Sequence, residues 1–401
     1  MHGTVTITGY DEARLAYRER NLRQALYDAG EVIMEDVLVN LHGDDHRSRR
    51  RVENRLYRRD TFEHYERELF PGIISTTVDP YVAQGRAELV SLGHQLMMNL
   101  AALTAGVDRP QGTPEESFRL YDYLTTFIEG ATLAHYTGDK DAKTAEVSAA
   151  LERFGEEFLV PGIERRRALL AAVERGEALA DELPKDVLTV LLQNEAELGL
   201  SYPSVRREVA FYLLAGAHTS ATAFTRVTHN ILTWLAGNPD DAELVRTDRR
   251  FVQRAVHETV RLQPSSPVAM RWALADVTLG SGRSISKGDK LVIDLIRVNR
   301  DPSVFGPDAD AFDPHRATPE GVPPYGLSFG SGMHACIGQD LAAGLVPCDG
   351  DGEHLFGLVA GAVQYLFDHG ACADPDDPPT MDASTSRPYF GRYPILFPPA
   401  E

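Results

Sequence analysis

The sequence is poor in cysteine, in uninterrupted apolar runs and in positive charge. Its 401 residues include only three cysteines, Cys336, Cys348 and Cys372, which are too few for a disulfide framework and favour a reducing compartment. No apolar run is long enough to span a bilayer, and the longest, Ala210–Ala217, contains a glycine. The first twenty residues match neither a signal peptide nor a membrane anchor. We therefore expect a cytoplasmic protein with no membrane partner.

Lysine and arginine together number 40, against 59 aspartates and glutamates, which gives a formal net charge of −19. This acidity argues against non-specific binding of nucleic acid, so we expect no nucleic-acid partner. Two basic clusters, Arg47–Arg51 and Arg58–Arg59, stand out against that background. The sequence also lacks an internal repeat and a linker rich in Pro, Gly or Ser. Nothing therefore divides a chain whose length alone suggests two or three domains.

Hydrophobic periodicity predicts helices over most of the chain. Apolar residues recur at spacings of three and four over residues 113–200, with breaks such as Gly138-Asp139. Residues 201–236 form one continuous pattern that predicts a helix roughly 50 Å long. The remaining expectations are helices at 11–20 and 248–262, a helix through the arginine cluster capped by Asp44 or Asp45, an irregular segment at 21–43, strands at 4–8 and 268–296, and an ordered loop at 300–327.

The most informative motif is the run SFGSGMHACIG, residues 328–338, which precedes an apolar helical stretch at 339–345. It is typical of a loop that holds a heme thiolate. Glycines let the backbone turn tightly and lie close to a flat macrocycle. A helix that starts at Cys336 would favour the thiolate over the thiol, and a thiolate pushes electron density onto iron. The alternative is a buried structural cysteine in a glycine-rich turn.

With these residues the chain resembles the cytochrome P450 superfamily, in its soluble bacterial type, from about Thr4 to Leu345. The resemblance implies a single domain, 1–401, that is mainly helical (α+β) with a long central helix over the cofactor and a small β-rich part. It implies heme b (iron protoporphyrin IX) with Cys336 as the iron ligand. It also implies cofactor contacts from Phe329, Gly330 and Gly338.

The resemblance gives a structural role to Glu258-Thr259-Val260-Arg261. A spacing of three places Glu258 and Arg261 on one helix face, although most such pairs are exposed and contribute little. In the family an arginine from a downstream loop joins them, and Arg316 occupies that position here. A buried glutamate between two arginines can hold the loop that presents the cysteine.

Heme carries two propionates, so its pocket should offer cations. Four residues match propionate-binding positions of the family: His46, Arg50, Arg271 and His334. Taken one by one, each could equally be an exposed polar residue. The remaining arginines, Arg47, Arg49 and Arg51, cannot all face inward, and some are expected to form a basic patch that docks an acidic ferredoxin.

The long predicted helix contains Ala215-Gly216-Ala217-His218-Thr219. In the family, Ala-Gly-x-acid-Thr lies over the iron, and the acid and the threonine guide protons to dioxygen. Ala215 and Gly216 are then expected to contact the cofactor, and Thr219 to be catalytic. His218 replaces the acid, and it either relays protons or only forms a hydrogen bond between helices.

Other segments are carried over from the family by position, or depart from it. The substrate wall is expected from 22–41, from helices between Thr113 and Ala180, from Ser265–Ala269 and from Ser386–Tyr389. Ser265 and Ser266 are either substrate contacts or turn residues, and Leu213, Leu214 and Phe224 either line a cavity or pack in the core. The N-terminal segment is shorter than usual for the family. An acidic break at 347–352 interrupts the helix expected after Leu345, and Cys348 and Cys372 are expected to be incidental thiols.

We therefore expect a heme-thiolate monooxygenase of secondary metabolism that hydroxylates or epoxidises an apolar small molecule. It would use O₂ and two electrons from NAD(P)H, delivered by ferredoxin reductase and ferredoxin because the sequence contains no flavin or iron–sulfur motif. One alternative is an isomerase, a dehydratase or a peroxide-driven enzyme, which the departure at His218 motivates. Another is a heme-binding recruitment or sensor protein without turnover, against which the presence of Thr219 argues.

Overall fold

The computed structural model describes residues 3–346, 354–383 and 388–398. The chain divides into two compact units, and each is built from segments that are distant in sequence. Unit 1 comprises Met1–Arg23, Phe62–Leu96 and Thr219–Glu401, and unit 2 comprises Gln24–Thr61 and Met97–His218. The single domain expected from the sequence stays a prediction.

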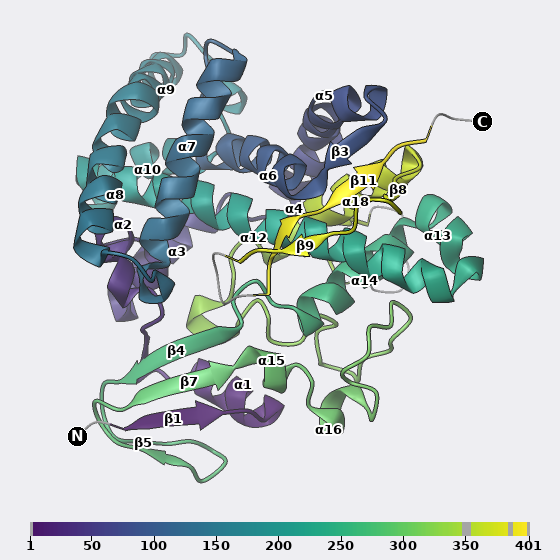
Figure 1. Cartoon of the computed structure of the whole chain (residues 1–401). Coiled ribbons are helices and arrows are strands. Elements are labelled where there is room, and N and C mark those ends of the chain that lie inside the picture. Colours follow the sequence, from purple (N-terminus) through teal and green to yellow (C-terminus); the bar gives the residue numbers. More distant parts are fainter. Residues whose placement is uncertain (1–2, 347–353, 384–387, 399–401) are drawn as a thin grey trace. The chain divides into compact units, whose positions relative to one another are not determined.

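Helices make up most of unit 2, whereas unit 1 combines helices with strands and long irregular segments (Figure 1). The helices of unit 2 are α2 (Glu31–Met34), α3 (Gly43–Glu53), α7 (Pro114–Ala131), α8 (Lys140–Phe154), α9 (Val160–Glu174), α10 (Val187–Gln193) and α11 (Glu195–Leu198), and its short helical turns include η2 (Leu38–Asn40). Those of unit 1 are α1 (Tyr10–Arg18), α5 (Phe70–Ala83), α13 (Ala242–Thr247), α14 (Arg249–Leu262), α15 (Leu295–Val298), α16 (Pro302–Phe305), α17 (Gln339–Ala343) and α18 (Leu358–Asp368), and its short helical turns include η8 (Gly332–His334). Three helices contain residues of both units: α4 (Arg59–His64), α6 (Leu89–Ala105) and α12 (Tyr202–Gly237).

The largest sheet has the strand order β1-β7-β4-β2, with β1 (Thr4–Ile7), β7 (Lys290–Asp294), β4 (Val268–Ala273) and β2 (Leu22–Gln24). β1 runs parallel to β7, and β4 runs antiparallel to it (Figure 1). Apolar side chains of this sheet and of α1 share one core, which includes Ile7, Tyr10, Ala13 and Leu291. The smaller pairings are β5 (Val277–Thr278) with β6 (Ser284–Ile285), β9 (Thr380–Met381) with β10 (Phe390–Arg392), and β3 (Arg86–Glu88) and β8 (Cys372–Ala373) on either side of β11 (Pro394–Leu396).

Most of the predicted elements are confirmed, as is the mainly helical fold class with a small β-rich part. The long helix expected at 201–236 is α12, and the helix expected at 248–262 is α14, where Asp248 caps the first turn by accepting from the Arg250 amide at 2.9 Å. The predicted cap of α3 is wrong. His42 is the N-cap residue. Asp44 and Asp45 lie in the first turn, where their negative charges interact favourably with the positive end of the helix dipole.

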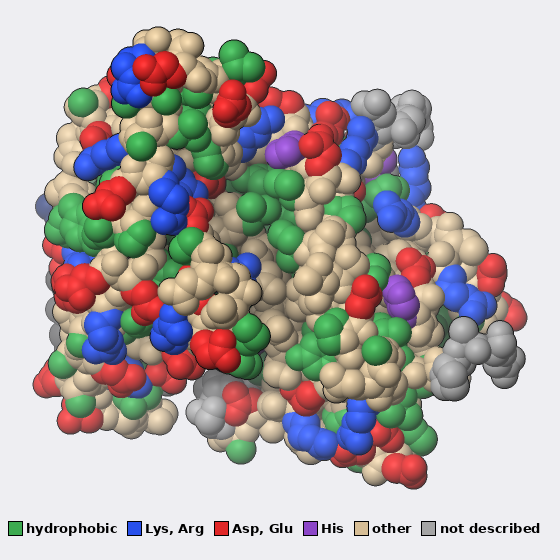
Figure 2. Space-filling model, turned by 90° about the horizontal axis from the view of Figure 1, so that it is seen from above, with side chains coloured by type: hydrophobic (Ala, Val, Ile, Leu, Met, Phe, Trp, Pro, Cys, Tyr) green, Lys and Arg blue, Asp and Glu red, His purple; other side chains and the backbone are tan. Residues whose placement is uncertain are grey.

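None of the helices in the described ranges combines the length and the hydropathy that crossing a bilayer requires. On the face drawn in Figure 2, lysine and arginine side chains lie among aspartates and glutamates rather than forming one continuous area. The distribution agrees with the many exposed ion pairs, such as that between Arg51 and Glu197 at 2.6 Å.

Candidate active site

Cys336 lies in a loop of unit 1 whose shape depends on glycine. The residue is exposed, and its amide donates to the carbonyl of Phe329 at 2.8 Å, which closes the loop. The Phe329 ring packs edge-on against Tyr325, with ring centroids 4.9 Å apart. Gly332 has a φ of +69°, and a Cβ there would lie 2.5 Å from the carbonyl oxygen of Tyr17. Because glycine tolerates both this φ and this approach, the loop can pack on α1 while Cys336 stays exposed.

Tyr17 also brings Arg271 next to this loop. Arg271 belongs to the buried face of β4, and its guanidinium carbon lies 5.2 Å from the centroid of the Tyr17 ring. A Cβ on Gly330 would lie 3.7 Å from the edge of the same ring. His334 ends the turn η8, which packs on α1. Tyr17, which the sequence did not single out, therefore contacts both Arg271 and the glycines of the cysteine loop.

The chain after the cysteine differs from the expectation, because no helix starts at Cys336. Helix α17 begins three residues later, at Gln339, and has five residues. It ends where Gly344 adopts a φ of +75°, so the last carbonyls lack intrahelical donors. Side chains of α14 supply donors instead: Gln253 donates to the carbonyls of Ala343 at 3.1 Å and Leu345 at 2.9 Å. Helix α14 therefore anchors this end of the cysteine loop.

His257, one turn after Gln253 on α14, adds a second donor to this anchor. Its Nε2 lies 2.8 Å from the carbonyl oxygen of Ala343. Burial lowers the pKa of His257 to about 4, so the ring is neutral near pH 7 and carries one N–H. Neither Gln253 nor His257 was expected to support the site, because both occupy ordinary positions in the pattern of an amphipathic helix.

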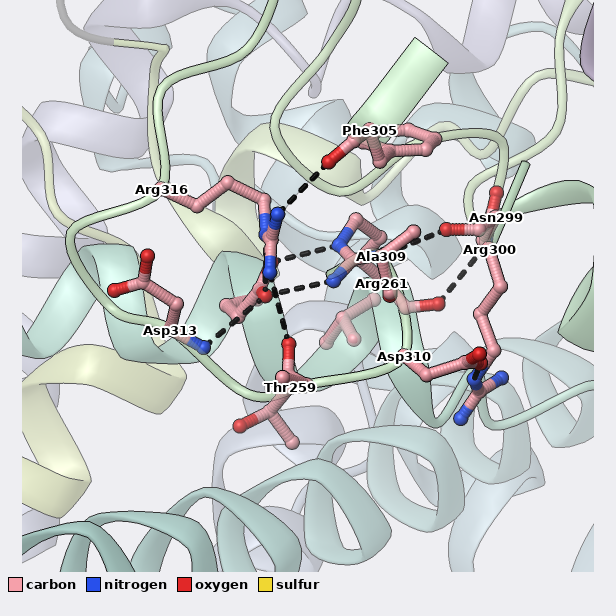
Figure 3. Close-up of polar contacts among 12 residues, drawn as sticks. Thr259, Arg261, Asn299, Arg300, Phe305, Ala309, Asp310, Asp313 and Arg316 are labelled. Atoms are coloured by element: carbon pink, nitrogen blue, oxygen red, sulfur yellow. Dashed lines mark hydrogen bonds and ion pairs between the residues drawn. The ribbon is translucent and has the colours of Figure 1, made fainter. Parts of the chain in front are cut away.

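The triad predicted from Glu258-x-x-Arg261 is assembled in unit 1 (Figure 3). Arg261 is fully buried and donates to both carboxylate oxygens of Glu258 at 2.7 Å. Arg316 donates to Glu258 at 2.9 Å, and its remaining N–H groups reach the carbonyls of Phe305 and Ala311 and both the side chain and the carbonyl of Asp308. The two arginines therefore fix the irregular segment 305–316 to α14.

Asn299 transmits this anchoring to the cysteine loop. It is fully buried, and its side-chain amide donates to the Arg261 carbonyl at 3.1 Å and to the Ser328 hydroxyl at 2.7 Å. Its side-chain oxygen accepts from the Leu327 amide at 2.8 Å. Ser328, the first residue of the motif, in turn donates to the Val260 carbonyl at 2.8 Å. Asn299 was missed by the sequence analysis, because a single asparagine after a short helix carries no distinguishing pattern.

The predicted oxygen-activating residues occupy α12, most of which is buried around them. Between Tyr212 and Thr228 the side chains are largely buried, but Gly216 and Thr219 are exposed and Ala215 is partly exposed. Spacings of three and four place these three positions on one face of the helix. A Cβ on Gly216 would lie 3.2 Å from the Cβ of Ala101 on α6, so helix packing within unit 2 already favours glycine there.

His218 is partly buried on the same helix, one residue before Thr219.

In unit 1, the Ser265 hydroxyl donates to the Thr219 carbonyl at 3.1 Å, and the Ser266 hydroxyl donates to the Val268 carbonyl at 3.0 Å. Both serines therefore bond to main chain, as turn residues do.

Three expected wall residues of α12 lie in the packed interior. Leu213 and Phe224 are completely buried, and Leu214 is 8% exposed. A Cβ on Gly93 of α6 would lie 2.9 Å from the Phe224 ring, so the two helices touch there. Core packing accounts for these side chains.

In unit 2, α3 carries the other two predicted propionate ligands. His46 is 2% exposed and Arg50 is partly buried, four residues apart on one face of the helix. Burial, followed by the charge of Arg50, lowers the pKa of His46 to about 4. Arg49 faces inward and pairs with Glu208 at 2.7 Å, whereas Arg47 and Arg51 lie on the surface. The expectation that the arginines divide between inner and outer faces is confirmed.

The residues of each unit fit a heme group. Unit 1 offers an exposed cysteine, the donor that ligates iron in heme-thiolate proteins, and the buried guanidinium of Arg271. Guanidinium groups pair well with carboxylates such as heme propionates. Unit 2 offers an imidazole and a guanidinium on one face of α3, and helix α12 has an accessible stripe.

Some sequence features take no part in the site. Cys372 is partly buried in β8, and burial raises its pKa, as expected for an unreactive thiol. Cys348, the break at 347–352 and Ser386 lie outside the described residues. A cavity of about 640 Å³ in unit 2 has an apolar wall that includes Val160, Ile163 and Val205. None of the predicted catalytic or cofactor-binding residues lines it, but Val160 and Ile163 belong to α9, within the substrate wall expected between Thr113 and Ala180.

The comparisons with known proteins all point to one family. The family model described as Cytochrome P450 matches residues 146–344. Pulcherriminic acid synthase of Bacillus subtilis (strain 168) is 25% identical over 348 residues, which cover 84% of this chain and 78% of that protein. The bifunctional cytochrome P450/NADPH--P450 reductase 2 of the same organism is 29% identical over 184 residues, which cover 41% of this chain and 18% of the relative. The chain therefore spans most of the first relative but under a fifth of the second.

Among solved structures, cytochrome P450 enzyme CYP109B1 from Bacillus subtilis superposes with a TM-score of 0.72 at 18% sequence identity. The alignment covers 98% of this chain and 92% of that one. At this identity the likeness concerns the fold alone.

Proposed function

The chain belongs to the cytochrome P450 family, and from that premise we propose that it is a heme-thiolate monooxygenase. One oxygen atom of O₂ enters an apolar substrate, and the other leaves as water after taking up two protons, together with two electrons that NAD(P)H supplies. The observation that carries the proposal is the loop in which Cys336 is exposed, between a glycine-dependent turn and the anchors on α14.

Heme b is the cofactor of the family, and this chain provides residues of the right chemistry for it. Cys336 would ligate the iron, and bound heme would supply the redox centre at which O₂ is activated, with thiolate ligation favouring O–O cleavage. The propionates would pair with His46, Arg50, Arg271 and His334, and Phe329, Gly330, Gly338, Ala215 and Gly216 would contact the macrocycle.

The direct test is the absorption spectrum of the reduced, CO-treated protein. A band at the position characteristic of thiolate ligation is the expected result, and a colourless protein after growth with ample heme precursor would refute the proposal. A screen of apolar compounds for spectral shifts then identifies substrates. The synthesis of pulcherriminic acid belongs to that relative, but the similarity to it supports a role in secondary metabolism.

Thr219 and His218 are proposed to deliver protons to the reacting oxygen. The Thr219 hydroxyl holds a proton on the accessible stripe of α12, and the His218 imidazole passes protons towards it, because one imidazole nitrogen can accept a proton while the other donates one. We expect Thr219→Ala to keep consuming NAD(P)H while product formed per NAD(P)H falls about tenfold or more. The measurement is the ratio of product to oxidised cofactor.

The matched control for Thr219→Ala is Thr228→Ala on the same helix. Thr228 is fully buried and donates to the Phe224 carbonyl at 2.9 Å, so its loss affects packing but not an accessible hydroxyl. Equal coupling in Thr219→Ala and wild type would show that Thr219 delivers no proton. Product formation with hydrogen peroxide alone, without reductant, would favour the peroxide-driven alternative that His218 motivates.

The electron donor is proposed to be a ferredoxin that contacts the exposed arginines of α3. Arg51 is exposed and pairs with Glu197, while Arg47 pairs with Asp44. Exposed pairs contribute little stability, so both arginines can exchange partners for carboxylates of an acidic protein.

Reversing the charge at Arg51 tests this docking. We expect Arg51→Glu to slow reduction by ferredoxin severalfold at low ionic strength, with the difference fading as salt screens the contact. The control is Arg175→Glu, the same charge change at an exposed arginine after α9. Reduction rates that are the same in both variants and insensitive to salt would exclude α3 from the docking surface.

A further inference from the structure

Unit 2 contains two buried carboxyl groups that the proposed reaction does not use. Glu53, the last residue of α3, and Glu208, on α12, are both completely buried. Glu208 accepts from the Leu38 amide at 3.0 Å and from Arg49 at 2.7 Å. Glu53 accepts from the Tyr212 hydroxyl, and its Oε1 has no hydrogen-bond partner within the described part of the chain. We call Glu53, Glu208, Arg49 and Tyr212 the carboxyl clamp, because they join α3 to α12.

The clamp cannot hold both carboxyl groups as anions at low cost. Two buried carboxylates beside one buried arginine would leave a net negative charge in the interior, which is strongly unfavourable. Glu208 has two good donors, one of them charged, whereas Glu53 has only a phenol. The negative charge is therefore best placed on Glu208, and the proton on Glu53.

Electrostatics agree with this assignment. Burial, followed by the charge of Glu208, raises the pKa of Glu53 well above its usual range. Burial raises the pKa of Glu208 to about 7, and Arg49 and the Leu38 amide oppose that rise. Burial and the charge of Glu53 raise the pKa of Tyr212, so the phenol keeps its proton.

The clamp shares its helix face with the predicted propionate ligands. His46, Arg49, Arg50 and Glu53 recur at spacings of three and four on α3. Three other titratable groups act on the clamp. The charge of Arg50 opposes the rise in the pKa of Glu53. Asp36 lies just before η2, and the Tyr57 ring stacks on Tyr212 at 6.1 Å. Helix α10, which also packs on α3, has no titratable side chain. Ionisation of Glu53 would therefore act on the same surface that positions His46 and Arg50.

We propose that Glu53 is a proton-dependent positioning residue, which in its neutral form lets α3 pack on α12 and in its ionised form loosens that contact. Neutral Glu53 places no second charge beside Glu208. Once Glu53 loses its proton, the two carboxylates repel each other inside unit 2. The consequence for heme, that His46 and Arg50 are held in place only while Glu53 is neutral, rests on the proposed function. The clamp itself does not.

Glu53→Gln tests the protonation state, because glutamine has the shape of the neutral acid and cannot ionise. In wild-type protein carrying ¹³C-labelled glutamate, the infrared spectrum at pH 8, above the pKa of Glu208, is expected to contain the carbonyl stretch of a neutral carboxylic acid. The band should disappear in Glu53→Gln and remain in Glu116→Gln, which changes a buried glutamate outside the clamp. Its absence from the wild type, or its persistence in Glu53→Gln, overturns the proposal.

The pH dependence of unfolding gives a second readout that a purely structural glutamate would not produce. Folded Glu53 keeps a proton that the unfolded chain releases near its usual pKa of about 4.3, so stability falls as pH rises between the two pKa values. In that window the unfolding constant of the wild type should rise up to about tenfold per pH unit more steeply than that of Glu53→Gln. Parallel pH profiles overturn the proposal.

Heme release separates this inference from the proposed function. Transfer of heme to an acceptor apoprotein should accelerate at alkaline pH in the wild type and much less in Glu53→Gln. Equal acceleration in both would remove the link between the clamp and the heme ligands, and so overturn Glu53 as a positioning residue. A protein that binds no heme at all would refute the proposed function, while the infrared band and the unfolding profiles would still decide the state of Glu53.

Discussion

Replacing Cys336 with serine is expected to abolish the thiolate signature of the reduced, CO-treated protein and to reduce monooxygenation to background. A serine hydroxyl does not ionise near neutral pH and is a poor ligand for this iron, so the electron donation that favours O–O cleavage is lost. The fold should tolerate the change, because Cys336 is exposed and its backbone bond to Phe329 does not involve the side chain. The measurements are the absorption spectrum and product formation with saturating reductant.

The matched control for Cys336→Ser is Cys372→Ser, which removes a partly buried thiol in β8. It should leave both the spectrum and the activity unchanged. Thiol titration of the heme-free protein adds a readout that needs no turnover: Cys336 should react faster than Cys372, whose pKa is raised by burial. An unaltered CO spectrum in Cys336→Ser would mean that another residue ligates the iron and that the site has been misassigned.

Most of the fold could be predicted because its long elements have strong local signals. Helix α12 has 36 residues of uninterrupted pattern, and α14 runs from its Asp248 cap to a stop just before Pro264. The cysteine motif was equally clear, because its glycines and cysteine must fall in register. Such signals depend on neighbours in sequence, which a single chain displays directly.

The supports of the site could not be predicted, because they depend on contacts between distant segments. Gln253 and Asn299 each reach main-chain atoms 28 or more residues away, and nothing near them in sequence indicates this. The clamp was missed for a related reason. The segment GDDHRSRRRVE is so highly charged that it reads as a surface helix, yet Arg49 and Glu53 are buried by α12 within unit 2. The helical stretch expected at 339–345 is α17, but no helix starts at Cys336 itself, because glycine-rich sequence is compatible with both a turn and a helix cap.

The position of Glu258 makes its replacement the most damaging change expected for the fold itself. Glu258→Gln keeps the shape of the side chain but removes the negative charge between Arg261 and Arg316. Arg261 is completely buried, and the side chain of Arg316 is 7% exposed, so neither guanidinium can regain its hydration. Breaking a buried ion pair from one side lowers the free energy of unfolding by about 3–5 kcal/mol. That loss is a large part of the roughly 5–15 kcal/mol that stabilises a typical protein.

The chain supplies its own control for this prediction, because Glu243-Leu244-Val245-Arg246 repeats the same Glu-x-x-Arg spacing on the surface. There the two side chains are 68% and 61% exposed and 3.1 Å apart, so Glu243→Gln should change the free energy of unfolding by only about 0.5 kcal/mol or less. Denaturant titration of the two variants compares the same chemical change in buried and exposed settings. If the free energy of unfolding falls by the same small amount in both variants, burial does not make the triad important for stability. If Glu258→Gln alone is severely destabilised and its Cys336 thiol becomes more reactive, Asn299 carries the disturbance from Arg261 to the cysteine loop.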